Sequence, residues 1–126
     1  MQDSVSISVS YYFPDPGIVP LEVSRAAIRF TERGDGSVIL ALGRSTVENS
    51  NAEARQEEFL KVEGALFAEI ERLKVSTDFL SRNRGELHLR LTLSPITGQA
   101  GIVLTRDLIT RWNNLGAEIY LDAFPD

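Results

Sequence analysis

The chain has 126 residues and no cysteine, so it is long enough to bury one sizeable core and cannot form disulfides or cysteine-ligated metal sites. Hydrophobic residues make up 43% and charged residues 25%, which argues against a disordered or fibrous protein. The formal net charge of −5 argues against nucleic-acid binding, because phosphate recognition needs a basic surface. We therefore expect a single globular domain over residues 1–126.

No segment resembles a membrane anchor or a targeting signal. The start of the chain lacks a basic segment followed by an apolar stretch, and no window approaches the ~20 apolar residues that span a bilayer. We expect a cytoplasmic protein that does not bind membranes.

A strand is predicted at the front of the chain. Apolar or aromatic side chains occupy every second position over residues 5–13, and the positions between them are mostly serine. This period of two is typical of a strand that is buried on one face only. Prolines and a glycine at 14–17 end the strand.

Residues 19–27 fit two structures, a short helix opened by Pro20 or an extended segment. Apolar residues at 28–30 and 38–42 then flank a polar run, which predicts a β-hairpin. The tip carries Arg-Gly-Asp at 33–35, a tripeptide that integrins recognise, but glycine and aspartate are also the residues that a tight turn requires. We interpret the tripeptide as a turn, and the polar residues 44–51 as a connection.

A long helix is predicted next, capped by Ser50 or Asn51 and reaching about Val75. Its apolar residues recur at spacings of three and four, which places them on one face: Phe59, Val62, Leu66, Ile70 and Leu73. Gly64 lies inside this helix, where glycine costs up to about 1 kcal/mol relative to alanine. We expect Gly64 to mark a close contact between the helix and the sheet.

The second half of the chain contains further predicted helices and strands. A short capped helix over 76–80 precedes a strand with leucine at every second position over 87–93, and residues 101–104 form a short partner strand. Thr105 caps a second helix that ends at Gly116, before a final alternating strand over 119–123. The predicted fold class is α+β: a largely antiparallel sheet with one long and one short helix packed on one face, as a two-layer sandwich.

The segment from Leu104 to Asp122 combines a strand, a capped helix, a Leu-Gly-Ala stop and a last strand that bears an aspartate. In this it resembles a family of small, mainly bacterial domains known as domain of unknown function 4279. The resemblance covers mainly the half of the chain from the long helix onward. Residues 15–27 match the family's acidic-proline turn and short helix, whereas its proline after that helix and its tryptophan before the next strand are missing. The resemblance implies an α+β sandwich and no activity.

The face opposite the helices is the candidate binding surface. If the three alternating strands share one sheet, their polar side chains all project from the uncovered face, and tyrosine, arginine and paired charges are common at protein interfaces. The predicted binding residues are Tyr12, Glu86, His88, Arg90, Tyr120 and Asp122, accompanied by Ser6, Ser8 and Ser10.

Catalysis finds little support in the residues. His88 is the only histidine, and no nucleophile with a suitable spacing accompanies it, so we interpret it as an exposed polar residue of a strand. Asp15, Glu22 and Asp35 are scattered without the spacing of a calcium loop. We expect no catalytic residue, no metal and no cofactor. A locally basic stretch could bind an anion or an acidic partner, but we interpret it as an ordinary solvated surface with cations near a helix C-terminus: Arg72, Lys74, Arg82, Arg84 and Arg90.

Three functional hypotheses remain open at this point. The leading one is a non-enzymatic protein-binding module, of the immunity or inhibitor type, that uses the open sheet face or an edge strand. The second is an enzyme or small-molecule carrier with a pocket between the long helix and the sheet, with Asp122 or Glu86 as acid or base. The third is a homo-oligomer whose self-association buries the serine-rich face.

Overall fold

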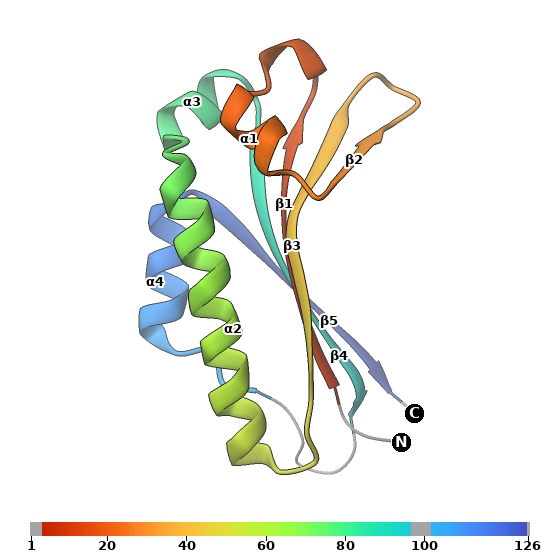
Figure 1. The fold of residues 1–126 in the computed structure, drawn as a ribbon, viewed down its shortest axis with the longest axis vertical. Helices are drawn as coiled ribbons and strands as arrows, with labels where there is room; N and C mark the ends of the chain where they lie inside the picture. Colours follow the sequence, from red (N-terminus) through yellow and green to blue (C-terminus); the bar gives the residue numbers. More distant parts are fainter. Residues whose placement is uncertain (1–3, 97–101, 126) are drawn as a thin grey trace.

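The computed structural model describes residues 4–96 and 102–125. Five strands form one sheet in the order β2-β3-β1-β4-β5, with the two longer helices on one of its faces (Figure 1). The strands are β1 (Ser4–Phe13), β2 (Arg29–Glu32), β3 (Val38–Glu48), β4 (Glu86–Ile96) and β5 (Ala117–Pro125). The helices are a 3-10 turn η1 (Pro16–Ile18), α1 (Leu21–Ala26), α2 (Ala52–Leu73), α3 (Thr77–Arg82) and α4 (Arg106–Asn114). The predicted α+β class is confirmed.

The core lies between the sheet and the helix layer. Burial alternates along the whole of β1, as the sequence predicts, and the leucines of β4 are buried in the same way. From the helices, Phe59 and Ile70 of α2 and Leu108 and Trp112 of α4 complete this core. The alternating strands therefore bury one face against the helices and leave their polar residues on the other.

One pair of strands is parallel. The three other pairs in the sheet are antiparallel, but β4 and β5 run in the same direction because α4 connects them as a crossover. The predicted strand over 101–104 is wrong for residues 102–104, and Gly101 lies outside the described residues. Gln56 of α2 explains this: its side-chain amide bonds both the N–H and the C=O of Val103, each at 2.9 Å.

Strand β3 is longer than predicted. Residues 44–48, expected to be a connection, pair with the first half of β1 from Arg44 opposite Ser8 to Glu48 opposite Ser4. The register shifts at Leu42, which is an extra residue in β3 and produces a bulge. Beside it, a Cβ on Gly43 would lie 2.3 Å from Leu66 Cδ2 of α2. The close approach of helix and sheet is therefore at Gly43.

The predicted helix caps are confirmed. Asn51, Ser76 and Thr105 each accept a backbone N–H of the following turn. Helix α2 ends at Leu73, slightly before the predicted Val75, because Lys74 adopts the left-handed conformation. The ambiguous segment 19–27 contains the helix α1. The expectation for Gly64 is wrong, because a Cβ there would meet nothing within 4 Å.

In the described part of the chain, every helix is too short or too polar to cross a membrane.

Candidate functional site

All six predicted binding residues lie on the sheet face opposite α2 and α4. Because β4 lies between β1 and β5, polar residues of three strands meet in rows across the sheet. The rows pair Tyr12 with Glu86, Ser10 with His88 and Glu118, Ser8 with Arg90 and Tyr120, and Thr92 with Asp122. No helix described in the structure covers this face (Figure 1), which we call the open face.

Arg90 and Tyr120 form the centre of a contact network on the open face. The Arg90 guanidinium lies 4.8 Å from the centroid of the Tyr120 ring and donates a hydrogen bond to Asp122 Oδ2 at 2.8 Å. The His88 imidazole meets the same ring edge to face, with 5.0 Å between centroids. These contacts restrict the rotamers of four predicted site residues. Tyr12 stands beside Glu86, at the end of this network.

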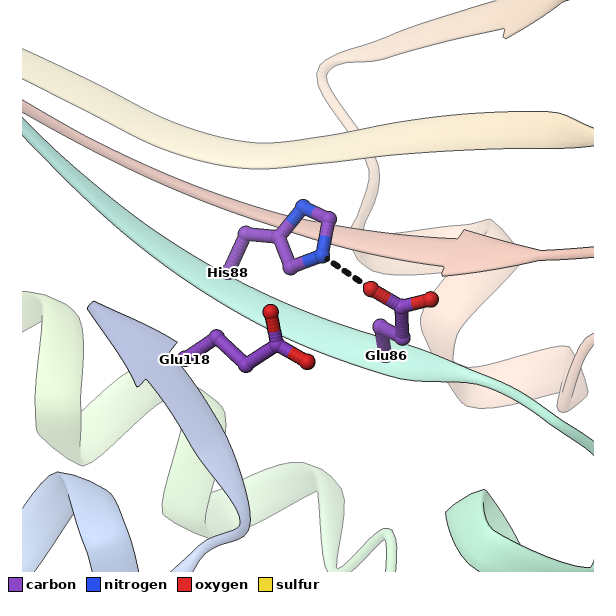
Figure 2. A group of neighbouring side chains, drawn as sticks. All are labelled: Glu86, His88 and Glu118. Atoms are coloured by element: carbon purple, nitrogen blue, oxygen red, sulfur yellow. Dashed lines mark hydrogen bonds and ion pairs between the residues drawn. The ribbon is translucent and has the colours of Figure 1, made fainter. Parts of the chain in front are cut away.

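Two carboxylates and an imidazole converge next to this network. His88 Nε2 lies 2.8 Å from Glu86 Oε1, and the Tyr120 hydroxyl donates to Glu118 Oε2 at 2.7 Å. Figure 2 shows the three side chains side by side over β4 and β5, and their donor atoms all lie within 4.8 Å of one another. The hydrogen bond to Glu118 raises the pKa of Tyr120, because the carboxylate stabilises the phenol proton. This set of nitrogen and oxygen donors could hold a metal ion.

A hollow of about 610 Å³ lies beside this network on the open face, over β1, β2 and β3, and Arg90 and Thr92 of β4 are also among its lining residues. Small residues make its floor: Ser6, Ser8, Ser10, Ala41 and Gly43. Longer side chains stand around them, among them Arg29, Arg44 and Arg90. Arg44 and Arg90 are both register partners of Ser8, one from each neighbouring strand. The Cα atoms of two arginines therefore flank Ser8, although the Arg90 guanidinium itself lies over β5, bonded to Asp122.

This hollow is basic although the chain is acidic. No carboxylate is among its described lining residues. Over residues 4–96 and 102–125, no ion pair involves Arg29 or Arg44, whereas Arg90 is paired with Asp122. Arg29 and Arg44 therefore present uncompensated positive charge to anything that enters the hollow.

The locally basic stretch of the sequence is not one surface. Arg72 pairs with Glu69 on α2, and Arg82 Nε donates to Asp78 at 2.9 Å on α3, while Arg90 lies on the open face. The alternation of β4 directs Arg90 away from the helices, which separates it from its neighbours in sequence.

One hypothesis from the sequence was a pocket between the long helix and the sheet. The structure instead has a groove of about 620 Å³ between α2 and α4. Glu86 and Asp122 cannot act as acid or base there, since both lie on the opposite face. The groove contains the buried carboxylate of Glu63, which accepts from Arg111 at 2.7 Å and from Trp112 Nε1 at 2.9 Å. Both oxygens are bonded, so this carboxylate joins the two helices.

Sequence reasoning missed several of these residues. Glu118 alternates with Tyr120 on β5, so the same period of two could have included it. Arg44 was assigned to a connection, and the hairpin residue Arg29 was not connected to the serines of β1. Glu63 gave no signal, because a glutamate beside an apolar stripe is usually solvated.

No family model, curated protein or solved structure matches the chain. The resemblance to domain of unknown function 4279 therefore stays a prediction.

Proposed function

We propose that the chain is a non-enzymatic protein-binding module that holds an acidic segment of a partner protein in the hollow over β1, β2 and β3. The observation that carries this proposal is the gathering of Arg29, Arg44 and Arg90 around a floor of small residues, with no carboxylate among the described lining residues. Guanidinium groups bind carboxylates through paired N–H donors, and this planar geometry makes arginine the preferred partner of acidic side chains.

The register supports a carboxylate between Arg44 and Arg90. Neighbouring strands are about 4.8 Å apart, so the Cα atoms of these two residues are separated by about 10 Å across Ser8. Arg44 can reach a group seated above the serine, and the serine hydroxyl can donate to it. Arg90 would join them by turning its guanidinium away from Asp122 and Tyr120 of β5. Arg29 on β2 adds positive charge at the edge of the sheet, where a peptide can enter.

The shape of the hollow favours a protein segment over a small molecule. A pocket for a small ligand usually encloses about 70–90% of its surface, whereas this hollow is open along a sheet face. Tyr12 and Tyr120 stand on the same face, and tyrosine is enriched where proteins bind one another. A partner whose acidic segment fills the hollow could extend over both rings, as an inhibitor or immunity protein covers its partner.

Fluorescence anisotropy with a labelled glutamate-rich peptide tests the proposal. The wild-type chain should bind this peptide with an affinity that falls as salt rises, and it should not bind a matched lysine-rich peptide. The double variant Arg29→Gln with Arg44→Gln should lose at least about tenfold in affinity. Its control is the double variant Arg82→Gln with Arg106→Gln. This control removes the same number of positive charges from α3 and α4 and should bind like the wild type.

Three outcomes would contradict the proposal. If both double variants lost the same amount of affinity for the glutamate-rich peptide, the binding would depend on net charge alone. Free glutamate or inorganic phosphate binding as tightly as the peptide would assign the hollow to a small anion. A dimer in light scattering that the Arg29→Gln and Arg44→Gln changes dissociate would make a second copy of the chain the occupant.

A further inference from the structure

Separately from protein binding, we propose that Glu86, His88 and Glu118 form a binding site for a divalent transition-metal ion, with zinc as the best match. These residues lie on the β4–β5 half of the open face, away from Arg29 and Arg44. The sequence predicted no metal site, because Glu118 is distant from the other two residues in the chain and only strand pairing brings it to them.

Strand geometry directs the three donor side chains toward one point. Glu86 and His88 are two positions apart on β4 and so share a face, and Glu118 is the register partner of His88 on β5. Their donor atoms lie within 4.8 Å of one another (Figure 2). Two ligands of one zinc ion are about 3.0 to 3.4 Å apart, since each bond is about 2.0 to 2.1 Å long. Small rotations of the glutamate side chains would therefore close the set around an ion.

The local charge favours a dication. Glu86, Glu118 and Asp122 contribute three negative charges, and Arg90, which is paired with Asp122, contributes one positive charge. Among these four side chains, two negative charges remain uncompensated. The Glu86 and Glu118 carboxylates repel each other at this separation, and a bound dication would convert that repulsion into two attractions.

Tyr120 positions two of the three ligands. Its hydroxyl donates to Glu118 Oε2, which leaves Oε1 for the ion, and its ring packs against the edge of the His88 imidazole. Contacts of this kind orient metal ligands and are commonly worth a factor of about 10 to 100 in affinity. The His88 side chain is 21% exposed, and its Nε2 lies 2.8 Å from Glu86 Oε1, so a bound ion would replace the hydrogen bond between these two ligands.

The donor set selects the class of ion. An imidazole nitrogen suits zinc and its neighbours in the first transition row, whereas magnesium prefers a nearly ideal octahedron of oxygens and keeps several waters. Three protein donors would leave at least one position of zinc for water.

Calorimetry and NMR on the tag-free chain, freed of metal by a chelator, test the site. Zinc should bind at one ion per chain, manganese more weakly and magnesium not measurably. Because the chain has a single histidine, its imidazole nitrogens give one set of signals, and zinc should shift the Nε2 signal. His88→Gln and Glu118→Gln should each weaken zinc binding at least about tenfold. The control Glu48→Gln removes an exposed carboxylate of β3 and should bind like the wild type.

Tyr120→Phe separates positioning from ligation. This variant keeps the ring and loses the hydroxyl, so it should bind zinc more weakly than the wild type and still show the Nε2 shift. The proposal is overturned if zinc does not bind, if it binds without shifting the His88 signal, or if circular dichroism shows His88→Gln and Glu118→Gln folded while both retain wild-type affinity.

Discussion

Trp112 of α4 donates its indole N–H to the carboxylate of Glu63 on α2 at 2.9 Å, and both side chains are at most 1% exposed. Arg111 donates to the second oxygen of the same carboxylate and lies over the ring of Phe67, with 4.8 Å from its guanidinium carbon to the ring centroid. A buried carboxylate is tolerated only when it is bonded in this way. The two helices are therefore held in register by a polar contact inside an apolar layer.

Trp112→Phe should destabilise the fold by about 3 kcal/mol, because it keeps an aromatic ring but leaves one oxygen of a buried carboxylate without its donor. Urea unfolding measures this loss. Glu69→Gln, an exposed change on α2, should alter stability by no more than about 0.5 kcal/mol. A Trp112→Phe variant that unfolds at the wild-type urea concentration would contradict the structural role of the contact.

Two glycine-to-alanine changes should act in opposite directions. Gly43→Ala brings a Cβ to 2.3 Å from Leu66 Cδ2, so the leucine must shift, at a cost of about 1 to 3 kcal/mol. Gly64→Ala meets nothing within 4 Å and should stabilise α2 by up to about 1 kcal/mol. Thermal unfolding compares the two variants. Adding Leu66→Ala to Gly43→Ala should give a non-additive effect, and strict additivity would refute the predicted clash.

Stability should fall in alkaline solution through Tyr11. Burial raises the pKa of Tyr11 from 10.0 to about 12, so the folded chain holds this proton more tightly than the unfolded chain. The protonated Tyr11 therefore makes its full contribution to the free energy of unfolding below about pH 10. This contribution, up to about 3 kcal/mol, is lost as the pH rises to about 12. Denaturant unfolding across this range should show a smaller decline for Tyr11→Phe. A Tyr11→Phe variant whose stability declines as steeply as that of the wild type would contradict this role.

Gln56→Ala should loosen the segment before α4. The variant removes both hydrogen bonds to the backbone of Val103, and a net loss of about 1 kcal/mol corresponds to roughly fivefold faster exchange of the Val103 amide. Hydrogen exchange followed by NMR measures this rate. Glu57→Ala, the neighbouring exposed position, should leave the exchange rate unchanged, and equal rates in the two variants would contradict the assignment.

Much of the architecture could be predicted from local patterns. The alternation in β1 and β4 identified the buried and open faces, and the caps at Asn51 and Thr105 located the starts of α2 and α4. These features depend on consecutive residues, because a few neighbouring residues decide both the direction of a side chain in a strand and the hydrogen bonding at a helix end.

Only the tertiary structure decided which distant residues become neighbours. The pairing of β4 with β5 brings Glu118 to His88, the length of β3 places Arg44 beside Ser8, and the packing of α4 on α2 buries Glu63. None of these contacts has a periodic signature, because each joins segments whose meeting depends on the packing of the whole core. The sequence by itself therefore determined the two-faced strands and the helix boundaries, and the arrangement in space determined the candidate sites.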